Sequence, residues 1–138
     1  MKAVYIEEHG GPEVLTYGER PEPIIGSDDV KVRVQASSLN RLDLYTRAGG
    51  RGLKRDFPPP LILGGDCSGD VIEVGDHVDQ LSVGDRVVVN PRLSCNMCSE
   101  CVSGKDDLCS RSTFMGSAVD GSYAEVAVSY THLRAHET

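Results

Sequence analysis

The sequence of 138 residues lacks a long hydrophobic run, because no apolar stretch approaches the roughly 20 residues that a membrane-spanning helix requires. Its first residues, MKAVYIEEHGG, also lack an apolar stretch of signal-peptide length. We therefore expect a soluble, cytoplasmic protein that has no membrane partner. At this length, the chain is expected to bury a single core as one domain.

Positive charge is scarce as well. The 14 Lys and Arg residues are outnumbered by 21 Asp and Glu residues, which gives a net charge of -7. Such a balance repels phosphate backbones, and only the short stretch at residues 51–55 concentrates basic side chains. Nucleic acid is therefore not an expected partner.

Helical patterns are equally sparse, and strand patterns dominate. The one helix we expect spans residues 40–47, with Asn40 as its N-cap and Gly49 as its stop. Many short strands joined by Gly-rich turns are typical of a mainly β fold, here a small, partly open β-barrel with one short helix. The expected strands cover residues 3–7, 14–18, 30–36, 71–74, 86–89 and 123–128.

What the sequence does contain is five cysteines, four of them in one loop at residues 91–115. The spacing Cys95-x2-Cys98-x2-Cys101-x7-Cys109 supplies the four soft ligands that a closed, tetrahedral zinc site needs. An iron–sulfur loop of ferredoxin type places its fourth cysteine three residues on and follows it with proline, whereas here the gap is seven residues and Ser110 follows. We therefore expect one structural zinc ion, which would hold the loop without taking part in chemistry.

The fifth cysteine, Cys67, lies beside a Gly-Gly turn. A small buried core residue is the interpretation that we favour over a catalytic thiol.

Taken together, several segments resemble the N-terminal catalytic domain of medium-chain dehydrogenases/reductases, the family of zinc alcohol dehydrogenases and quinone oxidoreductases. The resemblance covers residues 1–128 and implies a GroES-like barrel with a structural zinc loop. It also implies a parent enzyme that exchanges hydride between NAD(P) and a small alcohol, carbonyl, enone or quinone, and that forms a homo-oligomer. The segments are the cysteine loop and the stretches KVRVQASSLNRLDLYTRAG, ILGGDCSGDVIEVG and VGDRVVVNP.

The positions that bind catalytic zinc in this family are altered. By the resemblance, the Cys, His and Glu ligands match Asn40, Gly65 and Asp66, and the hydroxyl that relays the alcohol proton matches Leu42. Because zinc needs three protein ligands and one open position, we expect no catalytic zinc. The pattern is then similar to the zinc-independent quinone and enone reductases, in which Asn40 and Asp43 line the substrate side of the cleft.

Asn40 is the first candidate donor to a developing oxyanion, while a simple capping role for Asn40 and Asp43 is compatible with that function. Arg41 matches a position that contacts the cofactor pyrophosphate in some alcohol dehydrogenases, and a solvated surface Arg is the alternative. We thus name Asn40, Asp43 and Asp66 as candidate catalytic residues and Arg41 as the candidate cofactor contact.

A Gly-x-Gly-x-x-Gly fingerprint for NAD(P) does not occur in the sequence. We therefore expect a fragment that is inactive alone. The full-length parent enzyme is expected to be an enone or quinone reductase with a structural zinc ion. A zinc alcohol dehydrogenase with an altered metal set around Asp66 and a non-enzymatic zinc scaffold remain as alternatives. Residues 129–138, SYTHLRAHET, depart from the family pattern, and we expect them to form a disordered or foreign tail.

Overall fold

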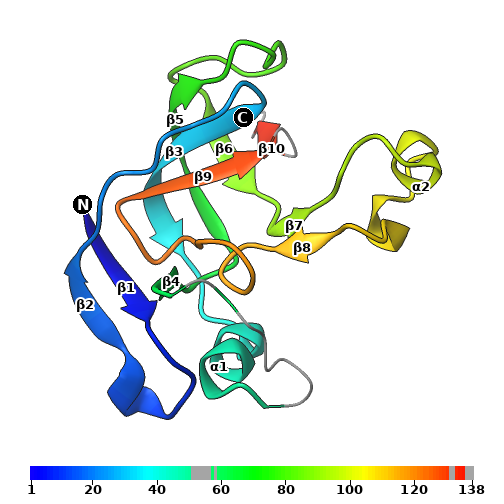
Figure 1. Ribbon diagram of the computed structural model, residues 1–138. Coiled ribbons are helices and arrows are strands. Elements are labelled where there is room, and N and C mark those ends of the chain that lie inside the picture. The colour runs from blue at the N-terminus through cyan, green and yellow to red at the C-terminus, as the bar shows by residue number, and fades with distance from the viewer. Residues whose placement is uncertain (51–56, 58, 131–132, 136–138) are drawn as a thin grey trace.

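The fold consists of antiparallel sheets that do not close. The computed structural model describes residues 1–50, 57, 59–130 and 133–135. Within these residues, the largest sheet has the strand order β10-β6-β5-β3-β9, and a smaller sheet has the order β2-β1-β4 (Figure 1). The mainly β, GroES-like fold class expected from the sequence is confirmed. The large sheet comprises β3 (Asp29–Ser37), β5 (Cys67–Val74), β6 (Arg86–Val89), β9 (Val126–Tyr130) and β10 (Leu133–Ala135), and the small one β1 (Lys2–Ile6), β2 (Thr16–Glu19) and β4 (Leu61–Ile62).

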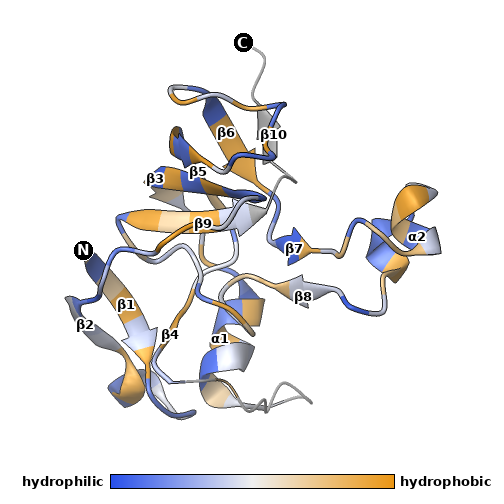
Figure 2. Ribbon diagram, turned by 45° about the horizontal axis from the view of Figure 1, so that its top comes forward, coloured by the Kyte–Doolittle hydropathy of each residue, from blue (hydrophilic) through white to orange (hydrophobic). Residues whose placement is uncertain are grey.

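The main core lies against the large sheet. β3 places Val30 and Val32 in the interior, both fully buried, as the period of two in a strand requires. Figure 2 shows apolar residues along β6 and β9 of the same sheet. The cluster around these valines comprises Val30, Val32, Cys67, Val71, Val78, Leu81, Val87, Val89, Leu93, Met115 and Ala127. Cys67 is therefore a core residue in the structure, as the sequence indicated.

The short helix α1 (Arg41–Ala48) begins and ends where the sequence predicted. Asn40 is its N-cap, and Asn40 N–H donates to the Asp43 carboxylate at 2.8 Å, which satisfies a backbone donor that the first turn leaves open. At the other end, Gly49 adopts a left-handed conformation with φ 71° and donates its N–H to Tyr45 O at 2.8 Å. These caps fix the position of the polar residues at the start of the helix.

The loop at residues 91–115 forms a lobe that extends away from the sheets (Figures 1 and 2). Its stem is the antiparallel pair β7 (Arg92–Leu93) and β8 (Thr113–Phe114), and its tip carries α2 (Ser99–Val102) and the 3-10 turn η2 (Asp106–Leu108). Another 3-10 turn, η1 (Pro12–Val14), precedes β2 and delays the start of that strand to Thr16.

The end of the chain, for which we predicted a disordered or foreign tail, takes part in strand pairing where it is described. Ser129 and Tyr130 continue β9 and pair with β3, and β10 pairs with β6 through Leu133 and Val89. Strand pairing uses backbone N–H and C=O groups, so many different side chains are compatible with it at an available sheet edge. Residues 129–130 and 133–135 are thus paired strand residues, while residues 131–132 and 136–138 lie outside the described part of the chain. A foreign origin of this tail stays a prediction. No helix in the described ranges is long and apolar enough to cross a membrane.

Candidate functional site

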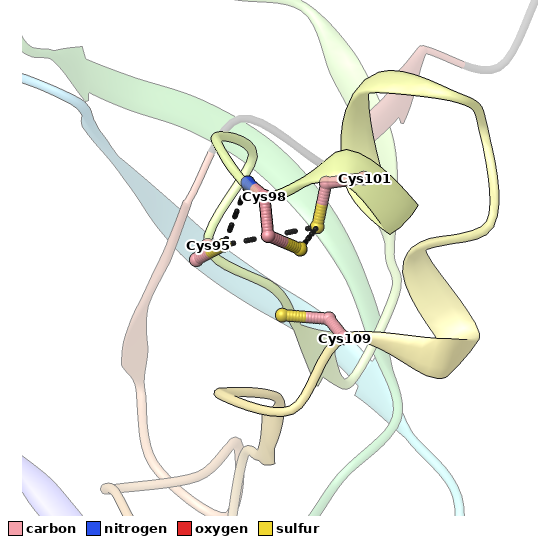
Figure 3. Close-up of side chains that lie close together, drawn as sticks. All are labelled: Cys95, Cys98, Cys101 and Cys109. Carbon is pink, nitrogen blue, oxygen red and sulfur yellow. Dashed lines mark hydrogen bonds between the residues drawn. The ribbon is translucent and has the colours of Figure 1, made fainter.

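The lobe brings the four predicted zinc ligands together. The Sγ atoms of Cys95, Cys98, Cys101 and Cys109 all lie within 4.8 Å of one another. Figure 3 shows the four side chains directed toward a common point, with Cys95, Cys98 and Cys101 on one side and Cys109 opposite them. Short turns at α2 and η2 produce this convergence, because they fold the seven residues between Cys101 and Cys109 back on themselves.

The arrangement fits a tetrahedral metal ion. With a Zn–S distance of about 2.3 Å, neighbouring sulfurs of a tetrahedral site lie about 3.8 Å apart. The structure gives 3.9 Å between the sulfurs of Cys95 and Cys101 and 3.4 Å between those of Cys98 and Cys101. All four donors are soft thiolates, the ligand type that favours zinc in a closed site.

Positive groups surround the sulfur of Cys95. Hydrogen bonds from the backbone N–H groups of Met97 and Cys98 lower the pKa of Cys95 to about 6. The Arg111 guanidinium also donates to this sulfur at 3.3 Å, which offsets part of the negative charge of the thiolate. The backbone N–H of Cys101 lowers the pKa of Cys98, but hydrogen bonding to the neighbouring thiols raises it, and the net pKa is high at about 12. The amide and guanidinium donors therefore favour the thiolate at Cys95, which is the form of cysteine that binds a metal ion.

A second cluster lies at the start of α1 and brings two candidate catalytic residues into contact. The side-chain amide of Asn40 donates to Asp66 Oδ2 at 2.6 Å and to Ser38 Oγ at 3.3 Å. Ser38 Oγ in turn donates to the same Asp66 oxygen at 3.0 Å. The three side chains form a closed triangle in which the carboxylate accepts both of its hydrogen bonds on one oxygen.

Asp43 lies beside this triangle and is buried, with 7% of its surface exposed. Its Oδ2 accepts the Asn40 N–H and also the hydroxyl of Tyr123 at 2.7 Å. Partial burial and the hydrogen bond to Asp43 together raise the pKa of Tyr123 well above its usual value, with burial the larger cause, so that the phenol keeps its proton. Asp43 thus accepts one hydrogen bond from a backbone N–H and one from a side-chain hydroxyl.

Sequence reasoning missed three residues of this site. Ser38 belongs to the triangle, Tyr123 binds Asp43, and the hydroxyl of Ser122 donates to the backbone oxygen of Asp66 at 3.1 Å. The one local signal was the pair Ser37-Ser38 directly before the N-cap, where hydroxyls commonly bond to nearby groups. Ser122 and Tyr123 carry no local signal, because their partners lie far away in the sequence.

The remaining predicted positions are placed as follows. Gly65 is buried next to Asp66, and a side chain starting there would meet Pro91 Cβ at 3.4 Å. Arg41, the candidate cofactor contact, is exposed at the first position of α1, and its role stays a prediction. The Asn40–Asp66 cluster and the cysteine lobe are separate features, since α1 and α2 lie apart in both ribbon views.

The open sheets, the short capped helix and the four-cysteine lobe together define a GroES-like domain of dehydrogenase type. The sequence profile of the alcohol dehydrogenase GroES-like domain matches residues 26–136, and the chain belongs to this family. The resemblance noted in the sequence is thereby confirmed.

Relatives and solved structures agree with this assignment. A sorbitol dehydrogenase of Bacillus subtilis is 37% identical over 106 residues, which are 76% of this chain and 30% of that protein. An L-threonine 3-dehydrogenase of Streptomyces coelicolor is 34% identical over 125 residues, 91% of this chain and 36% of that protein. The chain thus spans about a third of the length of the curated relatives it matches.

Among solved structures, an NAD-dependent alcohol dehydrogenase is similar with a TM-score of 0.89 and 40% identity, over 98% of this chain and 39% of that one. A thermostable alcohol dehydrogenase from Pyrobaculum aerophilum is similar with a TM-score of 0.90 and 33% identity, over 100% of this chain and 41% of that one.

Proposed function

We propose that this chain is the substrate-side domain, residues 1–128, of a cytoplasmic NAD(P)-dependent oxidoreductase that reduces enones or quinones without a catalytic zinc. A single structural zinc ion at Cys95, Cys98, Cys101 and Cys109 holds the lobe. The whole enzyme is a homo-oligomer, and the domain by itself does not turn over. Its partners are small carbonyl, enone, quinone or alcohol molecules, with no nucleic acid or membrane among them.

The observation that carries the proposal is the 2.6 Å hydrogen bond from the Asn40 amide to Asp66. By the family resemblance, these residues stand at two of the three catalytic zinc positions, and Gly65 stands at the third. A carboxamide nitrogen that donates to the carboxylate offers no lone pair to a metal, and glycine offers no ligand atom at all. The residues present therefore do not fit a catalytic zinc, and the reaction is assigned to hydrogen bonds.

In the proposed reaction, bound NAD(P)H would supply the hydride, to the β-carbon of an enone or to a quinone. The proton, which comes from water, then goes to the α-carbon of the enone or to the quinone oxygen. Asn40 stabilises the developing negative charge on the substrate oxygen. Of its two side-chain hydrogen bonds, the longer one, 3.3 Å to Ser38, is the one a substrate oxygen replaces. Asp66 keeps the shorter bond and so holds the amide in its orientation.

The proton reaches the site along Ser38 and Asp66, which are hydrogen-bonded at 3.0 Å and lie at a surface open to water. In the proposed reaction, Ser38 and Asp66 transfer the proton in place of the family's relay hydroxyl, whose position is occupied by Leu42 in this chain. Asp43 holds the N-terminal turn of α1 through its bond to Asn40 N–H. Arg41, exposed on the same turn, is the residue we assign to the cofactor phosphates.

A second candidate function is favoured by the relatives, which are sorbitol and L-threonine dehydrogenases, and by the similar alcohol dehydrogenase structures. It is alcohol oxidation with a metal held in another way around Asp66. A non-enzymatic zinc scaffold is the remaining alternative.

Metal analysis separates these functions. The purified chain is expected to hold one zinc ion, released by Cys98→Ser, and an enzyme that combines this domain with a nicotinamide-binding domain is expected to oxidise NAD(P)H with enones or quinones. Two zinc ions per chain, or NAD reduction by alcohols that a chelator abolishes, would establish the second candidate. If an enzyme that combines the two domains neither reduces enones or quinones nor oxidises alcohols, the non-enzymatic zinc scaffold is the function that remains.

A further inference from the structure

We infer that Ser122 and Tyr123 are positioning residues. They lie in the segment before β9, far from Asn40 and Asp66 in the sequence, and they set the distance between those two side chains. The inference rests on the proposed function for its catalytic meaning, but the geometry that it describes can be tested without activity. Neither residue is a ligand position of the family or part of the triangle itself.

Ser122 fixes the Asp66 side of the site. It is buried, with 1% of its surface exposed, and its hydroxyl donates to Asp66 O at 3.1 Å. Its N–H donates to Gly64 O at 2.9 Å, so two bonds tie it to the turn that carries Asp66. On its other side, Ser122 O accepts the hydroxyl of Ser37 at 3.1 Å. One residue thus links the end of β3 to the Gly64–Asp66 turn.

Tyr123 fixes the Asn40 side. Its hydroxyl lies 2.7 Å from Asp43 Oδ2 and 3.1 Å from Ser38 O, and Asp43 Oδ2 also holds Asn40 N–H. The ring of Tyr123 packs against Gly64, where an added Cβ would lie 2.5 Å from the ring. The ring therefore touches the turn on the Asp66 side, while the hydroxyl reaches the start of α1.

Ser122 and Tyr123 together connect the Asn40 side of the triangle to its Asp66 side, and we call these two residues the brace. Within the triangle, Asn40 and Ser38 contact Asp66 through exposed side-chain hydrogen bonds. Such bonds compete with water and give little stability alone. The buried bonds of Ser122 and the aromatic ring supply the rigidity that these exposed bonds lack. Since catalysis depends on sub-ångström placement of the donor, loss of the brace affects turnover more than binding.

The test is Tyr123→Phe in the 138-residue chain, read by amide hydrogen exchange. The backbone N–H of Asn40 is expected to exchange at least about tenfold faster, because Asp43 loses its second anchor. Val71 N–H, bonded to Asp85 O at 2.8 Å within the large sheet, is the internal reference and should not change. Tyr17→Phe, which removes the same hydroxyl from a side chain 72% exposed on β2, is the matched control and should leave both amides unaffected.

Ser122→Ala provides the second variant, and it is expected to speed exchange of the Asn40 side-chain amide protons that face Asp66. Unchanged exchange at Asn40 in both folded variants would overturn the inference. If Tyr123→Phe unfolds the chain, the Ser122→Ala result decides alone. In an enzyme that carries a cofactor domain, Tyr123→Phe should lower kcat about tenfold with KM within twofold. Absence of reductase activity in the parent enzyme would refute the proposed function but leave the exchange result as the test of the brace.

Discussion

Asn40 and Asp66, 26 residues apart in the sequence, are joined by a side-chain hydrogen bond of 2.6 Å. The bond pairs a neutral donor with an acceptor that carries charge, which makes it stronger than one between two neutral groups. If Asn40 and Asp66 match two zinc positions of the family, as we propose, an amide occupies the carboxylate that would otherwise bind the metal ion.

Asn40→Asp should make this pair repel. Asp is as good an N-cap as Asn, so the helix start is retained, but two carboxylates then face each other across the position of the 2.6 Å bond. We expect a loss of about 1 kcal/mol of stability at pH 7, because the pair is exposed and screened.

The pH dependence of this variant follows from linkage. In the folded Asn40→Asp variant the two carboxylates share a proton that they have released in the unfolded chain. The stability of the variant, relative to the unsubstituted chain, therefore falls as pH rises from about 4 to 7. Urea denaturation at both pH values measures the effect. Asn40→Ser, which keeps a capping oxygen without charge, is the control, and an equal pH dependence in both variants would contradict the prediction.

Local patterns were sufficient to predict the helix caps and the clustering of the four cysteines, because each depends on residues close together in the chain. Asn40, Gly49 and the Cys-x2-Cys spacing belong to this class. The bonds of Ser122 and Tyr123 could not be predicted in this way, since they connect positions 56 and 80 residues apart. Their partners become neighbours only once the sheets have formed.

Residues 129–130 show that side-chain pattern carries little information about strand pairing. We predicted a disordered or foreign tail there, and Ser129 pairs with Val30 as a regular strand residue. Backbone ladders accept most side chains, so an unusual sequence is weak evidence for disorder where a sheet edge is available.

Cys98→Ser should release the zinc ion of the lobe. A serine hydroxyl remains protonated and is a poor zinc ligand, so affinity should fall roughly a hundredfold or more. Metal content after dialysis measures the loss, and trypsin should then cut the lobe at Lys105 and Arg111, both of which are exposed. Cys67→Ala is the matched control, because it removes a cysteine outside the cluster. A Cys98→Ser chain that keeps its metal would show that the ligand assignment is wrong.

Cys67 should resist alkylation in the folded chain. Desolvation in the core raises the pKa of this thiol from 9.0 to about 11, so little thiolate forms at neutral pH. At pH 8, the thiolate fraction should be roughly a hundredfold lower than for a free cysteine, and reaction with iodoacetamide should be slowed by at least that factor. Mass spectrometry of the zinc-loaded chain measures the modification.

The same shift predicts a loss of stability at high pH. A thiol whose folded pKa is raised stabilises the folded state fully below its unfolded value, and this contribution is lost as pH rises from 9 toward 11. The loss should be smaller in Cys67→Ala than in the parent chain over this range. Equal losses in the two chains would assign the effect to other groups.

Gly64 and Gly84 offer a comparison that separates backbone strain from crowding at the candidate site. Both adopt positive φ, 99° at Gly64 and 97° at Gly84. A Cβ at Gly84 would meet nothing within 4 Å, whereas at Gly64 it would lie 2.5 Å from the Tyr123 ring and 2.8 Å from Ser122 Oγ. Gly84→Ala should therefore cost only the backbone term, about 1 kcal/mol.

Gly64→Ala should cost about 2 kcal/mol more, because the ring of Tyr123 must move away from Asp43. Denaturant unfolding of the two variants gives the difference directly. The displaced ring should also speed exchange of Asn40 N–H in Gly64→Ala and leave it unchanged in Gly84→Ala, although the backbone strain is the same. If both variants lose the same stability, Tyr123 does not pack against the turn as tightly as its contact with Gly64 indicates, and the brace would have to rest on Ser122 alone.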